Sequence, residues 1–495
     1  MKHLYPLICV GLLVWGGILP GARALAQRVV YVDADASGMN DGSSWTDAYP
    51  SLQDALAAAL AGDEIWVVEG IYKPVAPADS ANVTDGDRTV SFELKNGVAL
   101  YGGFVGTEAA RDERDVASHP TILSGDLLSN DNENVVPDEP TRSDNSWSVV
   151  NANIGIDETA VLDGFTITGG NANPPPQNPN DTGGGLYVTS SSPTVRNIRF
   201  IANTARFGGG LGCLLASPTV TNVVFINNAA SENGGGLYTF ASSPTMRHLH
   251  FQDNVSNMSN TSAGRGGGLH NDGSAALMFH LTFIDNMAFR GGGVSSARDN
   301  SVLTNAVFLG NVATEYGGGM FNDGSSTVLM NAVFSGNRTL DPDRRGGGAI
   351  GNSLNEIGQP GPFIANATIS GNTAAKDGGA VLNISSSPTI INSVLWANQA
   401  GDRGPEMLNL GSNTAPSIFN SIVGGGLPDG AVDGGGNLDA DPLFADFDGA
   451  DGVVGTADDD LRLMLGSPAI DAGRNDGLVF DLLDLDDDGD TGEGV

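Results

Sequence analysis

Two short motifs alternate along most of this chain and restrict it to a repetitive fold. Three consecutive glycines begin at residues 183, 208, 234, 266, 291, 317 and 346, and an Asp-Gly-Gly-Ala variant begins at Asp377. Between successive glycine motifs lies a Phe-x-x-Asn motif, which begins at Phe200, Phe225, Phe251, Phe283, Phe308 and Phe334 and continues with Ile369 and Leu395 in place of Phe. The glycine motifs recur every 25 to 32 residues. A fixed period of this size is typical of a solenoid.

The residues between these motifs predict short strands joined by tight turns. Runs of three to five residues that end at each Phe alternate apolar and polar side chains, as strands do. Ser-Ser-Pro, Asn-Asp-Gly and Gly-Gly-Gly separate the runs and supply turn conformations. Each period therefore predicts one coil, whose strands pair with those of the next coil about 4.8 Å away. We expect an all-β, right-handed parallel β-helix solenoid.

A further column of asparagines stands three residues before each Phe position. It comprises Asn197, Asn222, Asn305, Asn331, Asn366, Asn392 and Asn420, with His248 and His280 in two adjacent coils. Stacked identical amides can hydrogen-bond from coil to coil, and buried turns must satisfy their polar groups. We therefore interpret the column as an internal ladder rather than as a row that recognises a ligand. The two histidines could alternatively share a metal ion.

The ends of the chain differ from the repeats and divide it into four predicted regions. Residues 1–26 combine a basic start, an apolar run and a small-x-small cleavage site, which predicts a secretory signal peptide. Residues 27–97 are expected to form an N-terminal cap and the first coil, with a capping helix between Ser51 and Gly62. Residues 98–436 are expected to form the β-helix repeats, and residues 437–495 an acidic C-terminal segment.

The charge and hydropathy of the chain exclude several classes of partner. The full sequence has 58 acidic and 23 basic residues and a net charge of −35. Such acidity disfavours nucleic acid and anionic membranes as partners. No segment after the signal peptide reaches the roughly 18 uninterrupted apolar residues of a membrane helix. We expect a mature protein that is monomeric and either secreted or attached to the cell surface.

The paired Gly-Gly-Gly-Leu/Ala-Ile and Phe-x-x-Asn motifs, over residues 160–425, resemble the repeats of the chlamydial polymorphic outer membrane proteins. That resemblance implies an outer-membrane-associated adhesin. Residues 63–72 resemble the first segment of pectin-lyase-like β-helices. The sequences at residues 441–444, 461–463 and 466–473 resemble the choice-of-anchor region found at the C-terminal end of many bacterial surface β-helix proteins. Here no sorting signal follows, so either the anchor is dispensable or the chain is a fragment.

The final residues contain a candidate calcium site. Carboxylates stand at alternate positions, with Gly489 where a calcium loop turns: Asp484, Asp486, Asp488 and Asp490. Hard oxygen ligands at this spacing suit calcium. The alternative is a solvated acidic tail. A second, weaker candidate consists of Asp446, Asp448 and Asp451.

The sequence offers little catalytic machinery, and the catalytic residues are unknown. After the signal peptide only Lys73, Lys95 and Lys376 are lysines, and none stands near an acidic cluster within a repeat. Arginines near the glycine motifs could position a uronate: Arg206, Arg265 and Arg290. A row of rings after the glycines could stack on sugars, although a packed stack is the simpler interpretation: Tyr187, Tyr238, His270 and Phe321.

Insertions of variable length follow the Phe-x-x-Asn motif in three coils, at residues 172–182, 255–265 and 338–345. In solenoids, insertions on one face often mark the binding side. We therefore expect an extracellular, adhesin-like protein that binds an extracellular polysaccharide or a surface protein through these loops. The alternatives are a polysaccharide lyase or glycoside hydrolase acting on acidic polysaccharide, and a structural envelope spacer.

Overall fold

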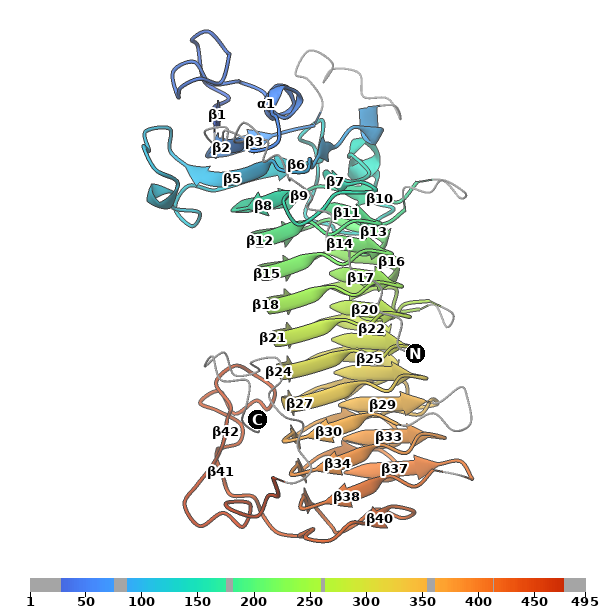
Figure 1. The fold of residues 1–495 in the computed structure, drawn as a ribbon. Coiled ribbons are helices and arrows are strands. Elements are labelled where there is room, and N and C mark those ends of the chain that lie inside the picture. Colours follow the sequence, from blue (N-terminus) through green and yellow to red (C-terminus); the bar gives the residue numbers. More distant parts are fainter. Residues whose placement is uncertain are drawn as a thin grey trace, which may run out of the picture.

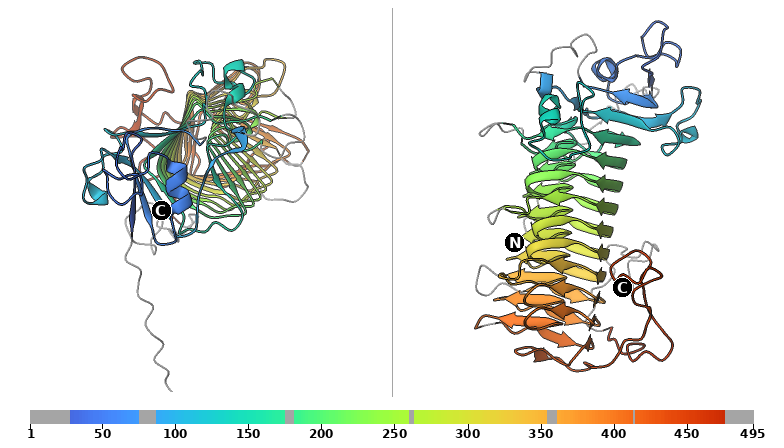
Figure 2. Two further views of the ribbon diagram at one scale, coloured as in Figure 1. Left: turned by 90° about the horizontal axis from the view of Figure 1, so that it is seen from above. Right: turned by 180° about the vertical axis from the view of Figure 1, so that it is seen from behind.

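The computed structural model describes residues 28–74, 87–174, 181–259, 263–353, 361–412 and 414–475. These residues form a right-handed parallel β-helix, in which successive coils stack into a long rod (Figure 1) and superimpose when seen along its axis (Figure 2). The predicted fold class is confirmed. The predicted signal peptide lies outside the described residues.

Each coil crosses three parallel sheets, which we call the first, second and third sheet in the order in which a coil meets them. Within the described residues the first sheet has twenty strands, because some coils contribute two. They are β1 (Val29–Val32), β2 (Glu64–Val68), β3 (Gly70–Tyr72), β5 (Ala99–Phe104), β6 (Thr121–Ser124), β8 (Val161–Asp163), β9 (Phe165–Thr168), β12 (Thr194–Ile201), β15 (Thr219–Ile226), β18 (Thr245–Gln252), β21 (Leu277–Ile284), β24 (Val302–Leu309), β27 (Val328–Ser335), β30 (Phe363–Ala365), β31 (Thr368–Ser370), β34 (Thr389–Ile391), β35 (Val394–Trp396), β38 (Ser417–Phe419), β39 (Ile422–Val423) and β40 (Val432–Asp433).

The second and third sheets complete each coil. The second consists of β10 (Asn171–Ala172), β13 (Thr204–Phe207), β16 (Ala229–Asn233), β19 (Val255–Ser256), β22 (Met287–Arg290), β25 (Val312–Tyr316), β28 (Arg338–Thr339), β32 (Thr373–Ala374) and β36 (Gln399–Ala400). The third consists of β4 (Phe92–Glu93), β7 (Val150–Ala152), β11 (Leu186–Thr189), β14 (Leu211–Leu214), β17 (Leu237–Phe240), β20 (Leu269–Asp272), β23 (Val294–Ala297), β26 (Met320–Asp323), β29 (Ile350–Ser353), β33 (Val381–Ile384) and β37 (Met407–Leu410).

A helix closes the N-terminal end of the rod, as predicted. The helix α1 (Leu52–Ala58) begins after Ser51, whose hydroxyl accepts a hydrogen bond from the backbone of Asp54. Its apolar face joins the main core. The helix ends at Ala58, earlier than expected, and Leu60 is exposed in the following turn. Three short 3-10 helices lie between the early strands: η2 (Asp87–Thr89), η3 (Arg111–Glu113) and η4 (Pro140–Asp144).

The strands of the first sheet are longer than the sequence suggests. From β12 to β27 they span eight residues, and each bends at one residue with a positive φ, such as Asn197 at 54° and Asn305 at 54°. Asparagine tolerates this left-handed conformation better than most residues do. The bend turns the strand without ending its pairing with the next coil. The sequence therefore predicted only the run of three to five residues that ends at each Phe, and missed the residues before the bend.

The asparagines of the Phe-x-x-Asn motif form an uninterrupted ladder inside the rod. Each side-chain Nδ2 donates to the Oδ1 of the asparagine in the next coil, at distances of 2.9–3.1 Å from Asn203 to Asn398. The same Oδ1 accepts the backbone N–H of the preceding asparagine, and Nδ2 also donates to a backbone carbonyl, as from Asn286 to Phe251 at 2.9 Å. Every polar atom of these buried amides is satisfied.

The ladder ends on a carboxylate. Asn398 has no following asparagine, and its backbone N–H and Nδ2 donate to Oε1 and Oε2 of Glu406 at 3.2 and 2.6 Å. A carboxylate only accepts hydrogen bonds, so it suits the end of a column that presents donors. Burial raises the pKa of Glu406 to about 7, although the bonds from Asn398 oppose the shift.

The asparagines three residues before each Phe position lie on the outside, contrary to the prediction of an internal ladder. They are exposed or half-buried, because the left-handed bend turns their side chains out of the rod. They still hydrogen-bond from coil to coil, as from Asn222 to Asn197 at 2.6 Å and from Asn366 to Asn331 at 3.0 Å. In this external column Nδ2 donates to the preceding coil, whereas in the internal ladder it donates to the following one. The column ends at Asp163, whose carboxylate accepts a hydrogen bond from Asn197 at 2.7 Å.

Phenylalanines and glycines set the packing between coils. The rings of the Phe-x-x-Asn motif are buried and stack from Phe200 to Phe334, with centroids 4.3–5.0 Å apart. At the corner between the second and third sheets, Gly208 has a φ of 64° and a Cβ on Gly209 would lie 2.5 Å from the Gly235 carbonyl oxygen. Only glycine lets neighbouring coils approach this closely.

The C-terminal segment folds back along the outside of the first sheet (Figures 1 and 2). Its strands β41 (Phe444–Asp446) and β42 (Asp460–Leu463) pair antiparallel. Asp459 accepts a hydrogen bond from the Ser335 hydroxyl at 3.0 Å, and a small cleft of about 360 Å³ remains between this segment and strands β24 and β27. Within the described residues, no helix has the length and apolarity needed to cross a bilayer.

The ladder predicts a stability difference between two matched substitutions. Asn286→Ala removes the acceptor of the Asn254 backbone N–H and of one of its two side-chain N–H groups, and the side-chain donor to the carbonyl of Phe251. It should lower the free energy of unfolding by about 3 kcal/mol or more. Asn305→Ala, in the external column, should cost about 1 kcal/mol, chiefly through the left-handed backbone. Equilibrium denaturation measures both. Equal losses would contradict the distinction between the two columns.

Glu406 predicts a pH dependence of stability. Because its folded pKa of about 7 lies above its ordinary value, the folded protein binds the proton more tightly, and stability falls as pH rises from about 4.5 to 7. Glu406→Gln replaces the carboxylate with an amide and so removes the titrating group. The amide oxygen can still accept both hydrogen bonds from Asn398, as an asparagine oxygen does at each of the preceding steps of the ladder. The free energy of unfolding of the variant minus that of the unmodified protein should therefore increase by up to about 3 kcal/mol from pH 5 to pH 8.

The control for that measurement is Asp402→Asn, a neighbouring carboxylate that is 59% exposed. It should leave the pH profile of thermal unfolding unchanged. A profile that Glu406→Gln does not alter would show that Glu406 does not titrate in this range.

Candidate functional site

A cleft of about 850 Å³ lies where the N-terminal part of the rod meets the first of the long loops. The N-terminal insertion between β6 and β7 forms one wall, and strands β10, β13 and β16 of the second sheet form the floor. Its lining residues are Arg88, Pro137, Asp138, Glu139, Pro140, Ser143, Asn171, Asn173, Pro174, Asp181, Arg206, Ser231 and Glu232. The lining is therefore polar and charged apart from three prolines.

Asn171 fixes the wall of the cleft to its floor. Its Nδ2 donates to the carbonyl of Arg142 at 2.9 Å and to that of Pro137 at 3.3 Å. Its Oδ1 accepts the Thr204 hydroxyl at 2.9 Å, one coil away. Residues 137–142 are thereby attached to the regular part of the β-helix, which gives the cleft a rigid frame.

Arg142 anchors the same wall from behind. Its side chain is only 2% exposed, and its Nη1 donates to the carbonyl of Ala202 at 2.9 Å and lies 3.3 Å from Asp131. Burial lowers the pKa of Arg142 and raises the pKa of Asp131. Because breaking a buried ion pair leaves an unpaired charge, this pair resists movement of the insertion.

Three charged residues from three levels of the rod form the floor. Arg206 donates to Glu232 at 2.8 Å and lies 3.1 Å from Asp181. The hydrogen bond to Glu232 raises the pKa of Arg206. The ion pairs hold these side chains in place, and all three are partly exposed. Each carboxylate can accept further hydrogen bonds besides the one from Arg206. The three side chains present fixed acceptors and donors to the cleft.

Arg88 occupies the opposite side of the cleft. Its Nε donates to the carbonyl of Asn145 at 2.7 Å, and its guanidinium lies 5.8 Å from the ring centroid of Trp147. The cleft therefore holds four carboxylates, from Asp138, Glu139, Asp181 and Glu232, against two guanidiniums. The local charge balance is acidic, like that of the whole chain.

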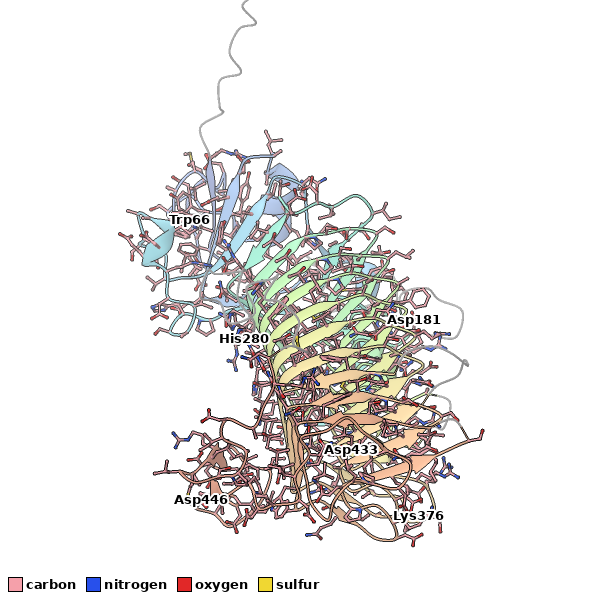
Figure 3. The ribbon with its side chains drawn as sticks, turned by 60° about the horizontal axis from the view of Figure 1, so that its bottom comes forward. Trp66, Asp181, His280, Lys376, Asp433 and Asp446 are labelled. Atoms are coloured by element: carbon pink, nitrogen blue, oxygen red, sulfur yellow. The ribbon has the colours of Figure 1, made fainter. Side chains whose placement is uncertain are left out.

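The long loops predicted to mark one face all leave the second sheet. They follow β10, β19 and β28, which belong to the same sheet. The cleft lies at the first of these positions, and Figure 3 shows Asp181 on the edge of the rod away from Asp446 of the C-terminal segment.

Only Arg206 of the three arginines singled out in the sequence lies in the cleft. Arg265 pairs with Asp323 at 2.6 Å, two coils away. Arg290 and Arg344 both pair with the buried carboxylate of Glu315. These arginines neutralise carboxylates of the rod itself. The three lysines also donate hydrogen bonds to backbone carbonyls: Lys73 to that of Leu127, Lys95 to that of Leu56 and Lys376 to that of Asp343.

Three of the four rings after the glycine motifs, those of Tyr238, His270 and Phe321, are buried and packed against neighbouring rings. Tyr238 and His270 stack with centroids 5.7 Å apart, and Phe321 is also buried. Burial lowers the pKa of His270 to about 3, and its Nδ1 donates to the carbonyl of Ser295 at 3.0 Å. Gly212 and Ser295 occupy the same position in intervening coils, so the row forms no continuous platform for sugars.

The candidate metal sites have different outcomes. Asp484, Asp486, Asp488 and Asp490 lie outside the described residues, so the calcium site stays a prediction. His248 and His280 stack face to face with centroids 4.8 Å apart. In the part of the chain that the structure describes, which includes Asp446, Asp448 and Asp451, no group of three or more metal-ligating side chains converges.

Little in the amino-acid sequence indicates the cleft. Arg206 and the loop ending in Asp181 could be singled out, because they adjoin the repeat motifs. Asp138, Glu139 and Arg88 belong to segments that do not repeat, and nothing in their spacing shows that they meet. The one signal for Asp138 and Glu139 is the length of the insertion between β6 and β7, which includes two prolines, Pro137 and Pro140. Arg88 lies outside this insertion.

The Chlamydia polymorphic membrane protein repeat matches at residues 222–239 and 366–384. Each matched segment starts at an external asparagine, crosses the Phe-x-x-Asn position and ends in a strand of the third sheet. The chain carries this repeat. The resemblance expected from the paired motifs is thereby confirmed in two coils. No curated protein matches the sequence significantly.

Several solved structures are similar at low sequence identity. Pectate lyase Pel9A has a TM-score of 0.38 and 15% identity, over 91% of this chain and 92% of that one. An alginate lyase from Paenibacillus sp. str. FPU-7 has a TM-score of 0.33 and 12% identity, over 77% and 99% of the two chains. The catalytic unit of a GH87 alpha-1,3-glucanase from Streptomyces thermodiastaticus strain HF3-3 has a TM-score of 0.30 and 11% identity, over 84% and 69%. Such low values transfer no activity to this chain.

Proposed function

We propose that this chain is an extracellular, adhesin-like β-helix protein of the cell surface, which binds a neutral polysaccharide in the cleft around Arg206. The observation that carries the proposal is the trio of Asp181, Arg206 and Glu232, held by the ion pairs within it on the edge of the rod where the loops leave. Sugar hydroxyls donate to carboxylates and accept from guanidiniums, so these groups match a carbohydrate chain.

The lining favours a polysaccharide over a protein partner. Protein interfaces draw most of their affinity from buried aromatic and other large anchors, whereas the side chains lining this cleft are polar apart from prolines. The predicted signal peptide and the surface-protein repeat support an extracellular setting. Residues on a rigid rod can hold a long polymer without rearrangement, which limits the entropic cost of binding.

The charge favours a neutral polymer over an acidic one. Four acidic residues line the cleft against two arginines, and both guanidiniums already contact protein groups. A uronate polymer would place further negative charge beside them, in a protein with a net charge of −35. The proposal therefore disfavours the alternative of an enzyme that acts on acidic polysaccharide.

Binding to soluble polysaccharides tests the proposal. Isothermal titration against neutral β-glucan, mannan and xylan and against polygalacturonate should detect binding to at least one neutral polymer and none to polygalacturonate. Arg206→Ala should weaken that binding at least about tenfold, a loss of about 1.4 kcal/mol, because it removes a donor and frees two carboxylates to repel each other.

Arg199→Ala is the matched control, since Arg199 is an exposed arginine of the same coil on the outer face of the first sheet. It should bind like the unmodified protein, and thermal unfolding should confirm that both variants fold. Preference for polygalacturonate, release of sugars from any polymer, or equal binding by Arg206→Ala would each contradict the proposal. Absence of binding to every polymer would favour the structural spacer.

A further inference from the structure

The outer face of the first sheet carries an apolar strip over six consecutive coils. Its members are Leu277, Phe279, Val302, Val328, Met330, Phe363, Ala365, Ile391 and Phe419. They project outward because they alternate with core residues along β21, β24, β27, β30, β34 and β38. In the three preceding coils the equivalent positions are polar, as at Thr245 and Arg247. We call this surface the apolar strip.

The centre of the strip is shielded from solvent. Phe279, Met330 and Ile391 are between 1% and 4% exposed, although they point away from the core. Thr304 pairs with Phe279 on one side and Met330 on the other, and it is also fully buried. Its hydroxyl has no hydrogen-bond partner. A buried, unpartnered hydroxyl on an outward face indicates that a further group lies against it.

The chain itself arrives at the lower end of this strip. The Asn420 Nδ2 donates to the carbonyl of Ala472 at 3.0 Å. One coil higher, the side-chain amide of Asn392 exchanges two hydrogen bonds with the backbone of Arg474, both 2.9 Å long. The guanidinium of Arg474 lies 5.6 Å from the ring centroid of Phe419. The segment thus climbs one coil in two residues, beside the strip and toward its centre.

We propose that the apolar strip is the docking surface for this chain's own C-terminal segment, residues 478–485. The sequence after Asn475 is Asp-Gly-Leu-Val-Phe-Asp-Leu-Leu-Asp-Leu, and residues 476–495 lie outside the described part of the chain. At two residues per coil, Leu478 reaches the level of Met330, Phe480 that of Thr304 and Leu482 that of Phe279. The backbone of this segment supplies the missing partner of the Thr304 hydroxyl.

The lengths and charges agree with this occupant. Ile391 and Phe279 are four coils apart, or about 19 Å at 4.8 Å per coil. About six fully extended residues would span this distance, so the eight residues that follow Arg474, up to Leu482, are long enough to do so. One coil beyond Phe279 the surface becomes basic, with the Arg247 guanidinium 4.3 Å from the Phe279 ring centroid. The segment becomes acidic at the same level, from Asp484 onward. The order of apolar and then charged residues therefore matches along both partners.

A tethered occupant is also favoured over a second copy of the chain. The segment begins where Asn475 already lies, so its effective concentration at the strip is in the millimolar range. Docking in this way fixes the C-terminal region along the first sheet, on the other side of the rod from the cleft. The proposal does not depend on the function of that cleft.

Site-specific photo-crosslinking tests the proposal in the full chain. With p-benzoyl-L-phenylalanine in place of Met330, irradiation should join the tryptic peptide of residues 299–338 to that of residues 475–495, in a product of monomer mass whose yield does not change on dilution. The same probe in place of Ile71, which is 62% exposed and far from the strip, should give no such product. Cross-links to another segment, or only between two chains, would overturn the proposal.

A second measurement uses variants within the segment. Leu478→Asp together with Leu482→Asp should uncover the strip and raise the fluorescence of bound 1-anilinonaphthalene-8-sulfonate at least threefold, as should deletion of residues 476–495. Thr491→Asp, outside the docked residues, should leave the fluorescence unchanged. If the first two variants fold and bind no more dye than the full chain, the segment does not cover the strip.

Discussion

The hydrogen bond from one coil to the next is the interaction on which this structure depends. A parallel β-helix has no antiparallel hairpins to fix its register, so each coil takes its position from the coil before it. Here the backbone ladders are reinforced by a buried amide column, in which every asparagine accepts from the coil before it and donates to the coil after it. The same coil-to-coil spacing places equivalent residues of successive coils next to each other. The phenylalanines can therefore stack, and the corners must be glycines because the backbones approach closely there.

An amide column has a direction, and both columns in this rod end on acceptors. The internal column presents donors at its C-terminal end, where Glu406 accepts them. The external column runs the other way and ends on Asp163, which also pairs with Arg114 and Arg196. Where the external column approaches its C-terminal end, the chain's own backbone at Arg474 binds Asn392. The ends of the repeat are therefore specialised even though its interior is uniform.

The sequence predicted the repeated features well and the irregular ones poorly. The Phe-x-x-Asn period was enough to predict the coils, and Ser51 was enough to locate the capping helix. The external column was placed on the wrong side, because its stacked amides were taken to satisfy the polar groups of buried turns. The left-handed residue at Asn197 breaks the regular alternation of faces along the strand, so that Val195 and Ile198 both point inward and the amide between them points out. Such a bend has no signal beyond the choice of asparagine itself.

Function in this chain is expected to lie in the parts that do not repeat. The cleft forms where the insertion at residues 137–143 meets the floor residue Arg206, and the apolar strip follows three coils whose equivalent outer positions are polar. Neither follows from the repeat, because both depend on segments that are distant in sequence and close only in the fold. The β-helix contributes a rigid frame that holds these groups at fixed distances.

Native-state hydrogen exchange tests the central role of the internal ladder most directly. The backbone amides of Asn228, Asn254, Asn286 and Asn311 donate to side-chain oxygens of the next coil. They should therefore exchange as slowly as the amides of the central strands of the first sheet. Exchange as fast as that of the exposed loop at Glu133 would show that the ladder opens freely and does not hold the coils together.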